Sequence, residues 1–201
     1  MNSPLDSVRK TLRAQLRAKR KAVPPDERAQ AGHLVARHAD RAHLLRTGRR
    51  IAIYASMREE LDTLPLIELA QRRGCQVFLP CIERRTGHLH FRETLPGSRE
   101  SVNHLGITEP EGTARIGARW LDIVFMPLVG FDHRGMRLGM GGGYYDRTFA
   151  WRNVREVWGG PRLIGLAYAF QQLPLIEGAA HDVRLDAVIT EKGIVRCRTG
   201  S

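Results

Sequence analysis

Leu121-Asp122-Ile123-Val124-Phe125-Met126-Pro127-Leu128 is a nearly continuous apolar run in the second half of the chain. Such a run is typical of a strand buried on both faces, as the central strands of parallel sheets are. Shorter apolar runs alternate with helical patterns on either side of it: Ile51–Tyr54, Gln76–Leu79, Leu89–Arg92, Leu163–Ala167, Ala187–Thr190 and Gly193–Cys197. This alternation predicts an α/β fold with a mostly parallel sheet flanked by helices.

Two helices are expected before the first strand. The first carries apolar residues at helical spacing, with a basic row of Arg9, Arg13, Arg17 and Arg20 between them. Pro24-Pro25-Asp26 ends this helix and starts a second one, which we expect to run to Gly48. A further helix is expected over Leu64–Arg73, capped by Asp62 or Thr63. We expect one domain over residues 1–201, with a helical hairpin over residues 5–46. The apolar residues of the first helix are Leu5, Val8, Leu12 and Leu16.

Composition limits the classes of protein and of ligand. With 42% hydrophobic and 26% charged residues, the chain is globular in type, neither disordered nor membrane-spanning. Its 32 basic and 21 acidic residues give a net charge of +11, which attracts polyanions: nucleic acids, nucleotide phosphates or polycarboxylates. The three cysteines form no CxxC pair, and nothing near Met1 has the pattern of a signal sequence. We therefore expect a cytoplasmic protein with no membrane partner.

A glycine-rich segment, Arg137-Leu138-Gly139-Met140-Gly141-Gly142-Gly143-Tyr144-Tyr145-Asp146-Arg147, follows the central strand and precedes an expected helix. α/β folds bind ligands at this position, beyond the carboxyl ends of the strands. The glycines allow backbone N–H groups to converge on phosphate oxygens, and Arg137 adds a cation. The segment lacks the Walker A and dinucleotide-binding patterns, and its glycine content alone favours a simple tight turn.

Together with the preceding Pro127-Leu128-Val129-Gly130-Phe131-Asp132, this segment resembles the signature of the 5-formyltetrahydrofolate cyclo-ligase family. The resemblance spans nearly the whole chain, because further segments match in the family's order. It implies a three-layer, Rossmann-like fold of the NagB/RpiA/CoA transferase-like kind. It also implies ATP- and Mg²⁺-dependent cyclisation of 5-formyltetrahydrofolate to 5,10-methenyltetrahydrofolate, with release of ADP and phosphate. The further segments are Ile53-Tyr54 with Glu60-Leu61-Asp62-Thr63, Gly106-Ile107-Thr108-Glu109-Pro110, and His181-Asp182 with Leu185-Asp186.

The resemblance also implies roles for individual residues. It implies catalytic roles for Arg137 and Tyr145, and magnesium ligation by Asp146 and Asp182. ATP is implied to contact Arg9, Lys10, Arg13, Arg137, Leu138, Gly139, Met140, Gly141, Gly142, Gly143, Tyr144 and Tyr145. The folate is implied to contact Ala55, Glu60, Met140, Gly141, Gly142, Gly143 and Tyr144.

Each of these roles has a plainer alternative. Asp146 could be a helix N-cap, Asp182 a turn residue, and Glu60 an ordinary loop acid. Arg9 stands where the family has a lysine, with Lys10 beside it, so either could contact ATP. A separation of four residues places Arg9 on the helix face of Arg13, with Lys10 about 100° away. Arg17 and Arg20 are expected on a solvated face.

The mechanism implied by the resemblance needs no enzyme nucleophile. The formyl oxygen on N5 attacks the γ-phosphate of ATP, N10 attacks the resulting phosphorylated imidate, and phosphate leaves. The sequence is also compatible with two other classes of protein. The charge could belong to a basic RNA-binding module, although no RRM or KH pattern predicts a nucleic-acid partner. The glycine loop could belong to an α/β sugar-phosphate enzyme. We expect a monomer that binds ATP and a folate, polyglutamylated or not.

Overall fold

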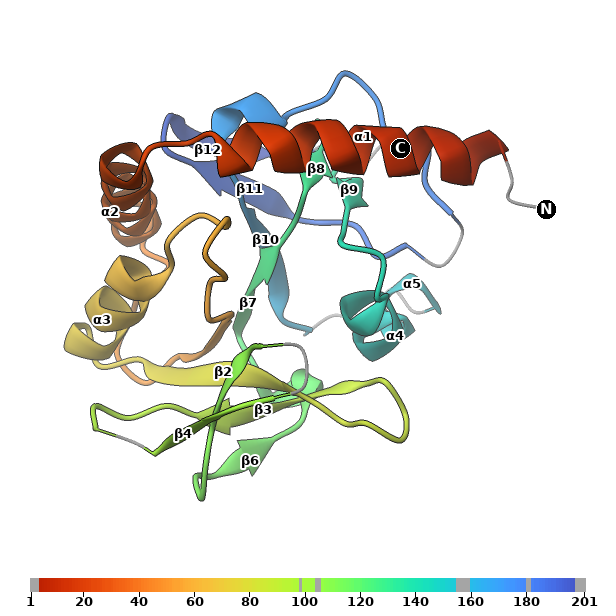
Figure 1. Ribbon diagram of the computed structural model, residues 1–201. Helices are drawn as coiled ribbons and strands as arrows, with labels where there is room; N and C mark the ends of the chain where they lie inside the picture. Colours follow the sequence, from red (N-terminus) through yellow and green to blue (C-terminus); the bar gives the residue numbers. More distant parts are fainter. Residues whose placement is uncertain (1–3, 98, 104–105, 155–159, 180–181, 198–201) are drawn as a thin grey trace.

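The structure, a computed structural model, describes residues 4–97, 99–103, 106–154, 160–179 and 182–197 (Figure 1). The helices are α1 (Pro4–Lys21), α2 (Pro25–Arg41), α3 (Leu64–Arg72), α4 (Tyr144–Phe149) and α5 (Trp151–Val154). The strands are β1 (Arg50–Ile53), β2 (Gln76–Ile82), β3 (Leu89–Glu93), β4 (Glu100–Val102), β5 (Thr108–Pro110), β6 (Arg115–Ile116), β7 (Ile123–Pro127), β8 (Gly130–Phe131), β9 (Arg137–Leu138), β10 (Arg162–Leu166), β11 (Ala187–Thr190) and β12 (Gly193–Arg196). Short 3₁₀ turns cover Ala118–Trp120 and Ala169–Gln171.

The main sheet has the strand order β12-β11-β10-β7-β1-β2-β3-β6. Strands β11, β10, β7, β1 and β2 run parallel to their neighbours, and only the outer strands β12, β3 and β6 are antiparallel. The apolar run around Phe125 forms β7 in the middle of this sheet and is buried, as its composition predicts. The predicted mostly parallel α/β sheet is therefore confirmed.

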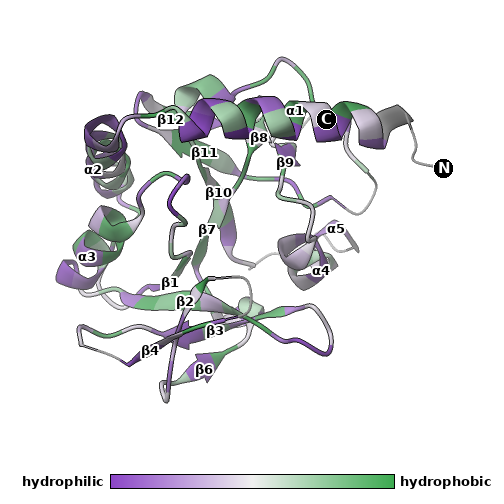
Figure 2. Cartoon of the chain, viewed as in Figure 1, coloured by the Kyte–Doolittle hydropathy of each residue, from purple (hydrophilic) through white to green (hydrophobic). Residues whose placement is uncertain are grey.

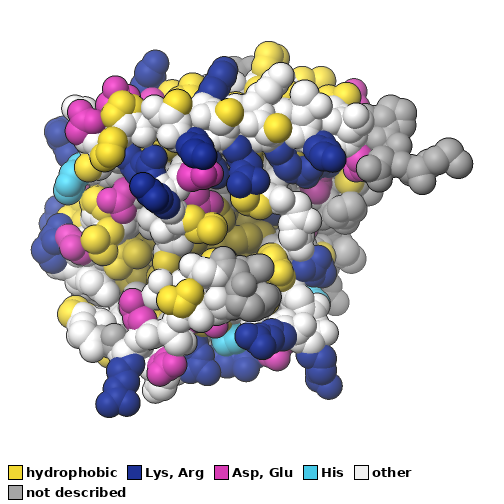
Figure 3. Space-filling view, viewed as in Figure 1, with side chains coloured by type: hydrophobic (Ala, Val, Ile, Leu, Met, Phe, Trp, Pro, Cys, Tyr) yellow, Lys and Arg dark blue, Asp and Glu magenta, His cyan; other side chains and the backbone are white. Residues whose placement is uncertain are grey.

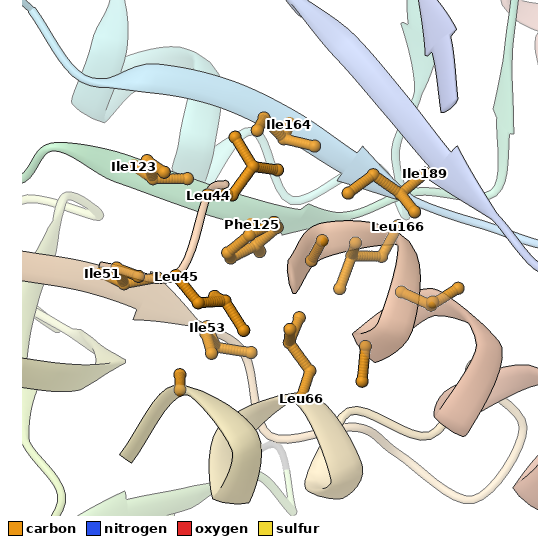
Figure 4. Packing of buried hydrophobic residues seen from close by; sticks show 14 of the residues in the cluster. Leu44, Leu45, Ile51, Ile53, Leu66, Ile123, Phe125, Ile164, Leu166 and Ile189 are labelled. Carbon is orange, nitrogen blue, oxygen red and sulfur yellow. The ribbon is translucent and has the colours of Figure 1, made fainter. Parts of the chain in front are cut away.

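Helices cover both faces of the sheet, which gives three layers. On one face, α2 and α3 pack on β1, β7, β10 and β11 through a cluster that includes Leu66, Phe125 and Ile164 (Figure 4). On the other face, α4 and α5 pack through Phe149 and Trp151 on a second cluster. Colouring by hydropathy shows the apolar residues gathered along the central strands and on the helix faces turned toward them (Figure 2). Burial of these two faces is the main stabilising contribution to the fold.

Helix α1 lies apart from both layers, across the edge of the sheet beside β8 and β9 (Figure 1). Its Leu16 is buried in a small cluster with Val129, Met136 and Leu138, and Leu12 packs against that cluster. Val8, which was expected on the buried face, is instead 60% exposed. The apolar contacts of the helix therefore come from Leu12 and Leu16.

The end of α2 and the start of α3 differ in detail from the sequence-based prediction. Helix α2 ends at Arg41, short of the predicted Gly48, because His43 adopts a left-handed conformation with φ of 54°. The Leu44 N–H then bonds the Ala39 carbonyl, a pattern that closes a helix end. At the start of α3, the N-cap position is Thr63, one of the two candidate caps, but its side chain makes no capping hydrogen bond; the Asp62 side chain accepts the Leu64 N–H instead. Across the described residues, no helix is long and apolar enough to cross a membrane.

Candidate active site

The parallel strands end at one edge of the sheet, and the segments that follow β1 and β7 carry the predicted site residues. Helix α1 lies along this edge, because its arginines bond the carbonyls of Leu128 and Gly139 beyond β7. Residues that are far apart in the sequence therefore meet here. The site is built from α1, the loop after β1, and the segment from β9 into α4.

The glycine loop, residues 139–143, joins β9 to α4 with its backbone open to solvent. Gly141 and Gly143 have φ of 105° and 64°, which side-chain-bearing residues rarely adopt. A Cβ added at Gly139 or Gly141 would meet no other atom within 4 Å. Within the described part of the chain, the amide N–H groups of residues 139–143 have no hydrogen-bond acceptor. This row of open donors is the arrangement that binds phosphate oxygens.

Arg137 and Asp146 form a partly buried ion pair beneath the loop. The Arg137 side chain is 5% exposed, and its Nη2 lies 2.6 Å from Asp146 Oδ1. Its Nη1 donates to the Val183 carbonyl, while the Val183 N–H donates to Asp146 Oδ1 at 3.1 Å. Asp146 lies in the first turn of α4 and Gly143 holds the N-cap position, so the alternative of an N-cap role is wrong.

A second Arg–Asp pair lies where α1 meets the segment before β11. Both Nη atoms of Arg9 lie 3.0 Å from Asp182 Oδ2, which also accepts the Ala179 N–H at 2.9 Å. The neighbouring Arg13 donates from Nε to the Gly139 carbonyl at 2.8 Å. Burial and the positive Arg9 lower the pKa of Arg13 from its ordinary value. His181, part of the matching segment, lies outside the described residues.

The orientation of α1 separates Arg9 from Lys10. Arg9 and Arg13 are half-buried and bond Asp182 and the Gly139 carbonyl, respectively, whereas Lys10 is exposed. The helical register predicted from the four-residue spacing is confirmed. Arg17 is exposed as expected, and its Nη2 lies 4.0 Å from Glu59 Oε2.

Arg20 was expected on a solvated face, but this prediction is wrong, because only 3% of the Arg20 surface is exposed. It donates from Nη1 to the Leu128 carbonyl at 3.2 Å and lies 3.9 Å from Glu60 Oε1. Helical spacing places it on the face of Leu16 and Arg13, which was the available signal. Because arginine side chains are usually exposed to solvent, the burial of Arg20 was not predicted.

Glu60 and two tyrosines meet beside Arg20. Glu60 is 7% exposed, and its Oε2 accepts the Met57 N–H at 3.0 Å. Burial raises the pKa of Glu60, while the Met57 hydrogen bond and then the Arg20 charge oppose that shift. Burial and the Glu60 carboxylate also raise the pKa values of Tyr54 and Tyr145, so both stay neutral phenols. Because Tyr145 belongs to α4 and its pKa responds to the Glu60 charge, the start of α4 and the Glu60 loop lie near each other.

A groove of about 810 Å³ opens beside this cluster and begins at Ala55, one of the predicted substrate contacts. In the space-filling view, basic side chains stand in a row along α1, above a hollow with hydrophobic side chains at its floor (Figure 3). The groove lies between α3 and the segment from β2 to β5. Its lining comprises Ala55, Ser56, Asp62, Thr63, Leu64, Ile67, Glu68, Gln71, Arg72, Leu79, Thr94, Leu95, Pro96, Gly97, Glu100 and Thr108.

The carboxylates in the site do not form a complete metal centre by themselves. Among the described residues, no three His, Cys, Asp or Glu side chains gather closely enough to hold a metal ion. Asp146 is 22% exposed and its second oxygen has no hydrogen-bond donor in the described part of the chain. One or two carboxylate oxygens completed by phosphate oxygens and water are the set that Mg²⁺ takes in nucleotide sites. The donor chemistry at Asp146 therefore fits that cation.

Comparison with known proteins gives consistent matches over most of the chain. The model of the 5-formyltetrahydrofolate cyclo-ligase family matches residues 6–191. The 5-formyltetrahydrofolate cyclo-ligase of Escherichia coli K12 is 34% identical over 179 residues, covering 87% of this chain and 96% of the relative. That of Mus musculus is 30% identical over 198 residues, covering 93% and 95% of the two chains.

A solved structure shares the architecture. The 5,10-methenyltetrahydrofolate synthetase of Aquifex aeolicus superposes with a TM-score of 0.77 at 26% sequence identity. The superposition covers 96% of this chain and 95% of the other. The three-layer fold and the helices at its amino end are therefore those of a known enzyme.

Proposed function

This chain belongs to the 5-formyltetrahydrofolate cyclo-ligase family, and we propose that it converts 5-formyltetrahydrofolate to 5,10-methenyltetrahydrofolate at the edge where α1 crosses the glycine loop. The observation that supports this location is the row of open amides at residues 139–143, flanked by Arg13 and Arg137. An acidic and phenolic cluster at Glu60 lies on the other side. The side with the open amides suits a polyphosphate, and the side with Glu60 suits a ring that donates hydrogen bonds.

ATP is the anionic ligand that the basic side of the site suits. The open amides of residues 139–143, Arg9 and Arg13 would hold its phosphates, and Arg137 would neutralise the transferring phosphoryl group. Each charge-assisted hydrogen bond of this kind contributes roughly 1.5 to 3 kcal/mol. Asp146 and Asp182 would hold Mg²⁺, which supplies further neutralisation of the phosphates. The arginines that would bind phosphate are thus held in the free protein by the aspartates that would bind the cation.

The folate would lie between Ala55, Glu60 and the glycine loop. The Glu60 carboxylate accepts hydrogen bonds, as the amino and ring N–H groups of a pterin require. The formyl oxygen on N5 attacks the γ-phosphorus of ATP and displaces ADP; N10 then attacks the phosphorylated formyl carbon, and phosphate leaves. The enzyme's task is to align two substrates and to exclude water from the activated intermediate. Tyr144 or Tyr145 would exclude that water.

We also propose that the protein acts as a monomer of one domain in the cytoplasm. For the compartment the support is chemical: the three cysteines, Cys75, Cys81 and Cys197, are free thiols, as is usual for proteins of a reducing compartment.

The direct test mixes the protein with 5-formyltetrahydrofolate and Mg-ATP and follows the methenyl chromophore and ADP together. Equal amounts of the two products are expected. ADP release triggered by a pentose phosphate would instead identify a sugar-phosphate enzyme. Salt-dependent RNA retention without turnover would identify an RNA-binding module.

The contacts of α1 give a prediction for ATP. Arg9→Ala and Arg13→Ala should each raise the ATP KM by roughly tenfold, the loss expected for about 1.4 kcal/mol of charge-assisted bonding. Lys10→Ala is the matched control and should leave the KM nearly unchanged, because Lys10 points to solvent. The three variants should be compared at fixed ionic strength, since each removes one positive charge. Damage by Lys10→Ala with a silent Arg9→Ala would show that the wrong side chain has been assigned.

A further inference from the structure

Arg20 is a charged residue that is buried at the end of α1. We propose that Arg20 is a positioning residue for the cyclo-ligase reaction: its guanidinium keeps the Glu60 carboxylate ionised and in place for the folate. The inference rests on the proposed function, because that function assigns Glu60 to the folate. Nothing requires Arg20 itself to touch either substrate.

The geometry of Arg20 is that of a connector between two parts of the site. The side chain comes from α1, and both it and Glu60 are almost wholly buried, with side-chain exposures of 4% and 9%. Arg20 Nη1 lies 3.9 Å from Glu60 Oε1 and donates to the Leu128 carbonyl at 3.2 Å. Arg20 therefore joins the loop after β1 to Leu128, which directly follows β7.

One donor of Arg20 is not used in the described structure. Its Nε is buried, and no described residue accepts a hydrogen bond from it. The ion pair with Glu60 is also wider than a direct hydrogen bond. Arg20 therefore acts on Glu60 through its charge, across 3.9 Å, rather than through a direct hydrogen bond.

The surroundings of Glu60 show why a cation matters there. From its own loop, Glu59 adds a negative charge nearby, and the Met57 N–H donates a hydrogen bond. Tyr54, directly after β1, and Tyr145, from α4, lie near it as neutral phenols. Arg20, from α1, supplies the opposing positive charge. A buried carboxylate that loses such a partner takes up a proton more readily, and a protonated Glu60 accepts hydrogen bonds poorly.

The first experiment measures the folate KM against pH for Arg20→Gln and Arg20→Lys. Arg20→Gln should raise the KM roughly tenfold near pH 7, the scale expected when a carboxylate loses an opposite charge at close range. Near pH 9 the KM should return to within about twofold of wild type, because Glu60 ionises again. Arg20→Lys keeps a charge and should stay within about threefold at both pH values.

Arg17→Gln is the matched control, since it makes the same change three residues earlier on α1, beside Glu59 on the surface. It should leave the KM and its pH dependence unchanged. Thermal unfolding of each variant separates loss of fold from loss of function. Equal KM increases at both pH values, with Arg20→Lys as impaired as Arg20→Gln, would overturn the proposal and leave Arg20 a structural anchor for Leu128.

A second measurement does not depend on turnover: a ¹³C NMR titration of the Glu60 carboxyl in the substrate-free protein. In Arg20→Gln the midpoint should lie at higher pH than in wild type, whereas Arg20→Lys and Arg17→Gln should stay near wild type. An unmoved midpoint in Arg20→Gln overturns the proposal. If the midpoint moves but Glu60→Gln keeps the wild-type folate KM, the assignment of Glu60 to the folate is what fails, and the role of Arg20 fails with it.

Discussion

Replacing Arg137 by alanine should lower kcat/KM by about a thousandfold, the upper range for loss of one preorganised group that stabilises transition-state charge. The side chain is buried beneath the glycine loop and is fixed by two partners, Asp146 and the Val183 carbonyl. It therefore needs little reorganisation to meet a developing phosphate charge. Steady-state kinetics with both substrates near saturation should place most of the loss in kcat.

Two further variants show whether this loss is specific to the site. Arg137→Lys should recover only a small part, because an ammonium cannot keep both partners and a phosphate oxygen in one plane. Arg73→Ala removes an arginine from an ion pair of equal length, 2.6 Å to Asp40, between α2 and α3. It should be kinetically silent. If Arg137→Ala shows only a modest loss of kcat/KM together with a lower unfolding temperature, the role of Arg137 is structural.

Asp146→Asn should lower turnover by about a hundredfold and weaken the dependence on Mg²⁺, as changes to a metal's carboxylate surroundings do. The amide keeps the shape of the side chain but not its charge, so the fold should persist. A binding measurement gives a second readout. In the presence of EDTA the variant should bind ATP at least as tightly as wild type, because Arg137 is no longer held by a carboxylate.

The matched control for this change is Asp40→Asn, which alters an aspartate of similar exposure in the pair with Arg73. It should affect neither the Mg²⁺ titration nor ATP binding. Wild-type activity of Asp146→Asn across the whole Mg²⁺ titration would remove Asp146 from the site. A loss of ATP binding in EDTA would mean that the Asp146 charge holds Arg137 in its useful position.

Much of the fold could be predicted from the sequence because its central elements are encoded locally. The apolar run that becomes β7 and the helix stops at Pro24 and Gly74 need no knowledge of the rest of the chain. The predicted end of α2 was wrong because the helix ends where His43 adopts a left-handed conformation, which the residue type alone does not demand. Hairpins as short as β8–β9 were missed because two-residue strands carry no periodicity.

Several residues that the structure brings together at the candidate site were named from the sequence, but the pairs that they form were not. The glycine loop and the Arg9 and Arg13 face follow from local spacing and resemblance. The partnership of Arg9 with Asp182 joins residues 173 positions apart, and no local pattern contains it. The burial of Arg20 was missed although its spacing from Leu16 indicated it, because an arginine is expected in solvent and its partners Glu60 and Leu128 come from distant segments.

Helix α1 also has a consequence for the order in which the molecule assembles. Its side chains reach Asp182, Gly139 and Leu128 across 173, 126 and 108 positions of sequence. Contacts that close such long loops form late, because the chain must already be ordered at their far ends. The layers of the sheet can form from shorter-range pairings such as β1 with β2. We therefore expect the sheet to form first during folding, and the helix that is first in the sequence to complete the site last.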